Sequence, residues 1–269
     1  MRIIRICLII LLVVVTFLFG YTEITQRISG KQEGPRIQCD TDIVQVSVNH
    51  TAADLLAGVT ASDAQDGDLT GKVIVGGISK LITNNTAKVT YLVFDSDSNM
   101  ASIVRYVKYT DYQRPRLELQ KPLVFSSTAS VSVSDSIRAH DAIDGDLSKA
   151  VRISTLSRTE HEDIYRVVAQ VTNSMGDTAR VELPVIIDNT TAAAPVITLK
   201  EQLVYLEAGS EFDAAGYVAS VKVDGREVSV SDVTVTHSVD TNTSGSYWVF
   251  YSYTSGEITG YAILTVVIP

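Results

Sequence analysis

Two short stretches of the chain carry carboxylates at a spacing that could bind a divalent cation. The first is Asp-Ala-Gln-Asp-Gly-Asp-Leu-Thr, and its acidic side chains are Asp63, Asp66 and Asp68. The pattern returns 78 residues later as Asp-Ala-Ile-Asp-Gly-Asp-Leu-Ser, with Asp141, Asp144 and Asp146. Calcium takes six to eight oxygen ligands, often from flexible loops of this kind. The six carboxylates are therefore candidate calcium ligands.

A structural interpretation competes with the calcium site. Asp-Gly favours a turn with a positive φ at Gly67 and at Gly145, and flanking aspartates readily accept hydrogen bonds from main-chain amides. No glutamate follows at the spacing of a known calcium-loop motif. The sequence favours the turn, with calcium binding as the alternative.

Other residue types that could do chemistry are scattered. Asp95, Asp97 and Asn99 have the spacing that begins an EF-hand loop, but Met100 occupies the position that requires glycine. The four histidines show no metal-ligand spacing: His50, His140, His161 and His237. A nucleophile elbow, a Cys/His pair and a phosphate-binding loop are all missing from the sequence. We predict a protein without catalytic activity and without a cofactor.

Aromatic residues gather near the C-terminal end of the chain. Trp248 and Phe250 could form a platform on which a sugar stacks, and we treat them as a possible ligand site. The competing interpretation places Tyr247, Val249 and Tyr251 on the core face of a strand, so that Trp248 and Phe250 face outward or toward a second sheet.

Strands must position all of these residues. Apolar and polar residues alternate over positions 87–94, 165–172 and 247–253, and each run leads through a turn into a return strand at 102–109, 179–187 or 261–268. Shorter strands are expected at 43–48 and 72–75, and no helix is expected within the repeats. Pro184 cannot donate to a strand ladder, so it should lie at an edge or a bulge.

The period of about 78 residues predicts three domains: 36–112, 113–190 and a divergent 191–269, called here the first, second and third repeats. Short strands with regular turns indicate an all-β protein of three immunoglobulin-like sandwiches. Three such domains in series would make a rod.

Composition limits the class of partner. The net charge is −9 among 269 residues, which argues against nucleic acid because no basic stripe offsets it. Only two cysteines occur, Cys7 and Cys39, so a disulfide framework is excluded and a bacterial origin is favoured for an exported chain.

The N-terminus predicts membrane attachment. Arg2 and Arg5 precede the uncharged run 6–22, so segment 1–22 is expected to be a signal anchor or transmembrane helix, followed by a stalk at 23–35. The arginines place the N-terminus in the cytoplasm and the rest outside a bacterial cell membrane crossed once. A cleaved signal peptide is the alternative.

The acidic stretch, the alternating strand after it and the turn Asp95-Ser96-Asp97-Ser98-Asn99 together resemble a known family. The chain is similar to the bacterial immunoglobulin-like domain of the pesticidal-crystal-protein type, related to the hyalin repeat, in three tandem copies from position 36 to 269. The third copy departs, since only Asp224-Gly225 remains of the acidic pattern. The resemblance implies a cell-surface or secreted protein with no common enzymatic activity.

Taken together, the sequence predicts a membrane-anchored extracytoplasmic rod for adhesion, scaffolding or interaction, with an unknown protein or polysaccharide partner. The alternative is a module that binds cell-surface polysaccharide or calcium, with the third domain as its head. One fold hosts many functions, so the fold alone names no ligand.

Overall fold

The computed structural model describes residues 10–22, 34–126, 132–158, 164–188 and 194–269. Residues 10–22 are helical. Among the described residues, no helix combines the length and the apolar character that crossing a membrane requires. The start of the predicted anchor (6–9) and most of the predicted stalk (23–33) lie outside the described residues.

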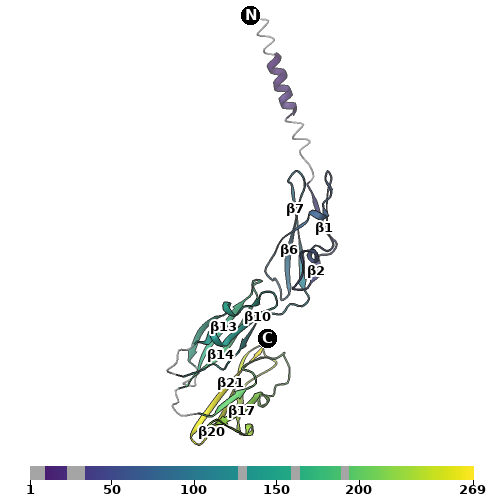
Figure 1. Cartoon of the computed structure of the whole chain (residues 1–269). Coiled ribbons are helices and arrows are strands. Elements are labelled where there is room, and N and C mark those ends of the chain that lie inside the picture. Colours follow the sequence, from purple (N-terminus) through teal and green to yellow (C-terminus); the bar gives the residue numbers. More distant parts are fainter. Residues whose placement is uncertain (1–9, 23–33, 127–131, 159–163, 189–193) are drawn as a thin grey trace. The chain divides into compact units, whose positions relative to one another are not determined.

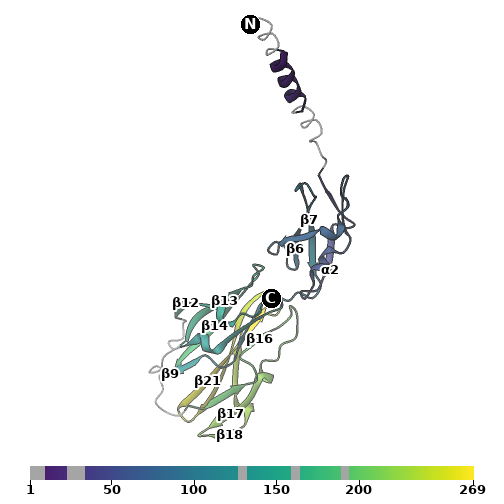
Figure 2. The same cartoon turned by 45° about the horizontal axis from the view of Figure 1, so that its top comes forward.

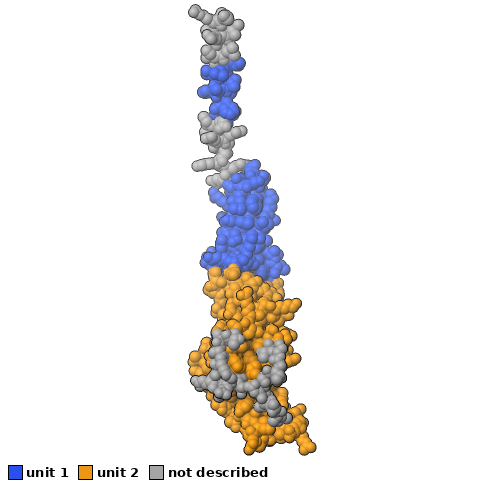
Figure 3. All heavy atoms as spheres, turned by 90° about the vertical axis from the view of Figure 1, so that its left-hand side faces the viewer, with its two compact units in different colours: residues 1–46, 50–79, 86–108 blue, residues 47–49, 80–85, 109–269 orange. Residues whose placement is uncertain are grey.

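The described chain divides into two compact units (Figure 3). The first contains residues 1–46, 50–79 and 86–108, and therefore most of the first repeat. The second contains residues 47–49, 80–85 and 109–269, and therefore the second and third repeats together.

All three repeats are built from one three-stranded and one four-stranded sheet with the same strand order (Figure 1). In the first repeat the sheets are β1-β3-β4 and β2-β7-β6-β5, with β1 Arg36–Cys39, β2 Ile43–Val46, β3 Val59–Asp63, β4 Gly67–Asp68, β5 Ile74–Ile78, β6 Thr86–Phe94 and β7 Met100–Tyr109. In the second they are β11-β10-β8 and β12-β13-β14-β9, with β8 Arg116–Leu119, β9 Val124–Ser126, β10 Ile137–Asp141, β11 Gly145–Asp146, β12 Arg152–Arg158, β13 Ile164–Thr172 and β14 Thr178–Asp188. In the third they are β15-β17-β18 and β16-β21-β20-β19, with β15 Val196–Leu199, β16 Leu203–Tyr205, β17 Val218–Val223, β18 Arg226–Val228, β19 Thr234–His237, β20 Gly245–Ser255 and β21 Ile258–Ile268. The expected all-β class is confirmed, and the two sheets of each repeat are consistent with immunoglobulin-like sandwiches.

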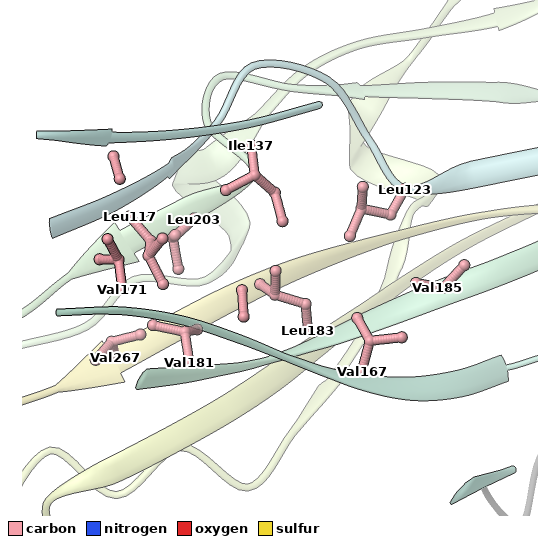
Figure 4. Packing of buried hydrophobic residues seen from close by; sticks show 12 residues of the cluster. Leu117, Leu123, Ile137, Val167, Val171, Val181, Leu183, Val185, Leu203 and Val267 are labelled. Carbon is pink, nitrogen blue, oxygen red and sulfur yellow. The ribbon is translucent and has the colours of Figure 1, made fainter. Parts of the chain in front are cut away.

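The core of each repeat is filled from the central hairpin of its four-stranded sheet. The predicted alternation is confirmed in β6, where Ala87, Val89, Tyr91 and Val93 are all fully buried. In the second repeat, side chains from both sheets meet in one cluster (Figure 4), which includes Leu117 and Ile137 from one sheet and Leu183 from the other.

Short helical segments are the main difference from the predicted elements. A five-residue α-helix, α2 (Ala52–Leu56), begins at a capping box between Thr51 and Asp54, and it is too short to give a helical period in the sequence. The strand expected at 72–75 is instead the 3₁₀ turn η1 (Thr70–Lys72) followed by β5. Similar turns occur as η2 (Val133–Ser136), η3 (Ser148–Ala150), η4 (Ala215–Tyr217) and η5 (Val230–Asp232).

Pro184 lies where β14 has a strand partner on one side only. It pairs with Arg166 of β13, whereas β9 on the other side begins its pairing two residues later, at Ile186. The Ile186 amide donates to the Leu123 carbonyl, so the backbone hydrogen bonding toward β9 involves a residue two positions after the proline, which itself has no amide proton to donate. The expected edge position is confirmed.

A buried tyrosine holds the middle of the core in two of the three repeats. Tyr91 is fully buried and its hydroxyl donates to the Leu55 carbonyl of α2 at 2.5 Å. Tyr251 is likewise fully buried and donates to the Ala214 carbonyl at 2.7 Å. The strand register places Ala169 at the equivalent position of the second repeat, because Val75, Ile153 and Val235 are the respective partners.

Replacing Tyr251 by Phe keeps the ring and deletes the hydroxyl, which leaves the buried Ala214 carbonyl without its donor. We expect a loss of about 1–3 kcal/mol in the free energy of unfolding, and the same for Tyr91→Phe. Tyr261→Phe is the control, because Tyr261 is 61% exposed and its change should stay within about 0.5 kcal/mol. Denaturant titration measures all three, and equal losses would contradict the structural role of the buried hydroxyls.

Candidate functional site

The acidic stretch of the first repeat forms a turn between β3 and β4 in which carboxylates accept main-chain hydrogen bonds. Asp63 Oδ1 accepts from the amides of Gln65 (2.7 Å) and Asp66 (3.0 Å). Asp68 Oδ1 accepts from the Thr70 amide at 2.9 Å. Gly67 has φ +75°, the left-handed conformation that glycine adopts readily, as the sequence predicts.

The second repeat reproduces this geometry between β10 and β11. Asp141 Oδ1 accepts from the amides of Ile143 and Asp144, both at 2.9 Å, and Asp146 Oδ1 accepts from the amide and hydroxyl of Ser148. Gly145 has φ +70°. Two sequences that share the pattern therefore fold into the same turn.

The middle aspartate of each stretch joins this turn to the hairpin turn after the central strand. Asp66 accepts from the amide (2.6 Å) and hydroxyl (2.8 Å) of Ser96. Asp144 accepts from the amide (2.5 Å) and hydroxyl (2.7 Å) of Ser174. Each carboxylate thus links the two sheets of its repeat at the same end.

These hydrogen bonds favour the ionised carboxylates. The hydroxyl and amide of Ser96 hold the pKa of Asp66 below its usual value, and those of Thr70 do the same for Asp68. The hydroxyl and amide of Ser148 lower the pKa of Asp146. The geometry is that of anionic caps on backbone amides, and no group of three or more metal-ligating side chains is found in the described part of the chain. Calcium binding by the six aspartates stays a prediction.

A buried polar network extends the second repeat's turn. Asp141 is 1% exposed, and its Oδ2 accepts from Asn173 Nδ2 at 3.0 Å. The same amide nitrogen lies 2.9 Å from the Tyr112 hydroxyl, which in turn donates to Asp177 Oδ2 at 3.0 Å. Arg114 pairs with Asp177 at 3.0 Å. The segment that leads into the second repeat is therefore fixed to its hairpin turn.

This network shifts three pKa values, and the hydrogen bond to Asp177 raises that of Arg114. Burial raises the pKa of Tyr112, and its hydrogen bond to Asp177 adds to the shift. Burial works against ionisation of Asp177, but hydrogen bonds from Arg114 and Tyr112 hold its pKa below the usual value. Tyr112 and Asp177 therefore have a structural role, because their polar atoms hydrogen-bond to one another.

The third repeat replaces the acidic stretch with a two-residue turn. Asp224 (φ +50°) and Gly225 (φ +77°) connect β17 to β18, where Val223 pairs with Arg226. Positive φ at both central residues is the type I′ geometry that suits a tight hairpin. Asp224 and Gly225, which are all that remains of the acidic pattern in this repeat, are the two residues that form the turn.

Trp248, one of the two residues predicted as a ligand platform, lies in the contact between the second and third repeats. Its indole Nε1 donates to the Glu182 carbonyl of β14 at 3.1 Å. The Arg166 guanidinium lies over the indole ring at 5.3 Å from the centroid, and Phe250 contacts the ring edge to face at 6.4 Å. Trp248 therefore has a structural role, and ligand binding at Trp248 and Phe250 stays a prediction.

The outer surface of the third repeat's four-stranded sheet covers an open side of the second repeat. The Tyr205 hydroxyl hydrogen-bonds the amide (3.0 Å) and carbonyl (3.2 Å) of Leu117 on β8, an edge strand. Leu203 and Val267 join the hydrophobic cluster of the second repeat (Figure 4). Strands β14 and β21 lie side by side in both cartoon views (Figures 1 and 2).

This contact joins two repeats that each have a hydrophobic cluster of their own. The second and third repeats lie in one compact unit, and Leu203 and Val267 of the third repeat join the cluster of the second. The domain bounds 113–190 and 191–269 stay a prediction. The sequence pattern showed each repeat's own alternation, but it could not show that Leu203 and Val267 face a neighbouring repeat.

The second repeat also has an open, largely apolar pocket of about 540 Å³. Its lining includes Ile153, the cross-strand partner of Ala169, and the position of Ala169 is the one that a tyrosine ring fills in the other repeats. The remaining lining is largely apolar: Ser132, Val133, Ser134, Val151, Tyr165, Val167, Val185 and Ile187. The residue pattern of the sequence did not predict this pocket.

Asp141→Ala removes the acceptor of two backbone amides and of the Asn173 side chain within a buried network. We expect a loss on the order of 3 kcal/mol in the free energy of unfolding, because each unsatisfied buried donor costs about 1–3 kcal/mol. The matched control is Asp63→Ala, where two amides near the surface can bond to water, and its effect should be clearly smaller. Equal effects in urea titration would contradict the buried network.

Trp248 is the single tryptophan of the chain, so its fluorescence reports on the contact between the second and third repeats. Arg166→Ala uncovers the indole ring, and the emission maximum should move to longer wavelength with a loss of about 0.5–1 kcal/mol in stability. Arg152→Ala, at an exposed arginine of the same sheet, should leave the emission unchanged. An unchanged spectrum in both variants would refute the stacked geometry.

Comparison with known proteins supports the fold class. Residues 197–261 match the family model described as "Bacterial surface protein, Ig-like domain". No curated protein matches the chain.

Solved structures give weak overall similarity. The M60 catalytic domain with the CBM51-1 and CBM51-2 domains of ZmpB from Clostridium perfringens shows 12% identity and a TM-score of 0.25, over 87% of this chain and 30% of that one. CBM51-2 with INT domains of the same protein shows 15% identity and a TM-score of 0.24, over 87% and 41%. Drosophila N-cadherin EC1-4 shows 11% identity and a TM-score of 0.24, over 88% and 76%. The chain thus spans less than half of the first two structures, and no functional inference follows from similarity at this level.

Proposed function

We propose that this chain is a non-catalytic interaction protein on the surface of a bacterial cell, with a role in adhesion or scaffolding. The observation that carries the proposal is the match of residues 197–261 to a bacterial surface immunoglobulin-like domain. The first two repeats lie outside that match but have the same two sheets in the same strand order. This supports three tandem immunoglobulin-like domains, at 36–112, 113–190 and 191–269, and we infer the pesticidal-crystal-protein type from the resemblance of the sequence.

Membrane attachment is the second part of the proposal. Residues 6–22 act as an uncleaved signal anchor with the N-terminus in the cytoplasm, because Arg2 and Arg5 precede the apolar run. Residues 23–35 form a stalk that leads to the first repeat outside the cell.

The hydrogen bonds and ion pairs of the acidic side chains support a role in interaction and not in catalysis. Asp66 and Asp144 cap serine amides and hydroxyls, and Asp177 pairs with Arg114. Groups that are satisfied in this way stabilise turns and linkers, and they are not poised for proton transfer. Partner binding then falls to exposed surfaces, toward a protein or a polysaccharide.

The test uses the full chain with a C-terminal tag, expressed in a bacterium. Protease added to intact cells should remove the tag while a cytoplasmic marker survives, and alkaline carbonate should leave the chain in the membrane. Leu11→Arg with Val14→Arg should abolish retention, because each central arginine costs about 2.5–3.5 kcal/mol on insertion. Leu11→Ile with Val14→Leu is the matched control.

Two outcomes would contradict the proposal in different ways. A tag protected in intact cells would refute surface exposure. Release of a shortened chain that lacks its N-terminal residues would refute the anchor and identify a cleaved signal peptide.

A further inference from the structure

The first repeat exposes an apolar sheet face. Its members lie on strands β2, β5, β6 and β7, and their exposed fractions range from 40% to 57%: Ile43, Ile74, Phe94, Met100, Val104 and Tyr106. We call this set the outer face. Register places Phe94 beside Met100 and Thr90 beside Val104 across β6 and β7, with exposed Ser102 between Met100 and Val104. Exposed apolar side chains gathered on one sheet face can mark an interaction site in soluble domains.

The same face is already an interface in the third repeat. The strand register aligns Tyr91 with Tyr251, so Lys88 corresponds to Trp248 and Tyr106 to Thr265. The third repeat's equivalents are buried against the second repeat: Leu203 is 9%, Thr265 1% and Val267 8% exposed. This fold therefore packs this sheet face against another repeat of its own kind.

On β6 and β7 the charges at the two ends of the outer face are opposite, while on the β2 side exposed Asp42 lies beside Tyr106. Lys88 and Lys108 are exposed at the end where β6 begins and β7 ends. Asp95 and Asp97 lie in the turn at the other end, about 20 Å away at about 3.3 Å per residue. Two such faces in antiparallel orientation bring each lysine end to the partner's aspartate turn.

We propose that the outer face of the first repeat binds the same face of a second copy of this chain, in an antiparallel, two-fold symmetric dimer. In such an interface each residue pair occurs twice, so Lys108 of one copy meets Asp97 of the other and the reverse. Val104, near the middle of the apolar strip, packs against its partner's strip. This inference rests on the proposed interaction role and names one partner for it.

The test measures the mass of the purified full chain in non-ionic detergent by light scattering that separates protein from detergent. We expect a dimer whose dissociation constant rises at least about 30-fold in Val104→Glu, since a central residue of an interface contributes about 2 kcal/mol or more. Val230→Glu is the matched control, because Val230 is 47% exposed outside this face, and it should remain a dimer. Thermal unfolding followed by circular dichroism verifies that both variants fold.

Charge reversal tests the orientation with exposed positions that do not endanger folding. Lys108→Glu and Asp97→Lys should each weaken the dimer, and the two changes combined in one chain should restore it. A native chain that is monomeric at all concentrations would overturn the proposal, even if it binds a different protein. Equal behaviour of Val104→Glu and Val230→Glu, or failure of the double reversal to restore association, would also overturn it.

Failure here is distinguishable from failure of the proposed function. Protease accessibility on intact cells reports surface display whether or not the purified chain self-associates. A displayed but monomeric chain refutes only the dimer, and a dimeric chain that stays inside the cell refutes only the surface role.

Discussion

Packing of the inward side chains of the central hairpins between two sheets is the constraint on which the rest of the structure depends. A unit of about 78 residues is near the lower end of what one hydrophobic core can stabilise without staples, so each inward position must be filled. Ala87, Val89 and Val93 are fully buried for this reason, and Tyr91 adds a hydroxyl that reaches the Leu55 carbonyl. The second repeat has Ala169 in place of that tyrosine, and its cross-strand partner Ile153 lines an open pocket.

The acidic turns follow from the same constraint. Two sheets that meet at one end leave backbone amides at their turns, and such groups require acceptors. Asp66 and Asp144 supply them to Ser96 and Ser174, and in doing so they tie one sheet to the other. The third repeat closes the corresponding connection with the tight turn at Asp224 and Gly225, and it has no need of the longer acidic stretch.

The outer faces of the four-stranded sheets differ in burial between the first and third repeats. In the third repeat this face carries Leu203, Tyr205 and Val267, which complete the core of the second repeat along its open side. In the first repeat the equivalent strands carry exposed Ile43 and Val104. The same sheet face is therefore buried in a contact within the chain in the third repeat and exposed in the first repeat.

The sequence by itself determined the local features of this protein. The alternation over 87–94 and 165–172, the turns at Gly67 and Gly145 and the edge position of Pro184 could all be read from residue types, because strand period, glycine conformation and the missing proline donor are local properties. Only the tertiary structure decided which outward residues meet a neighbour. The sequence left Trp248 either in a sugar platform or facing outward or toward a second sheet, and its partners Arg166 and Glu182 lie more than 60 residues earlier in the chain. Such contacts depend on how separate sheets pack, and the residue period of a single strand does not predict that packing.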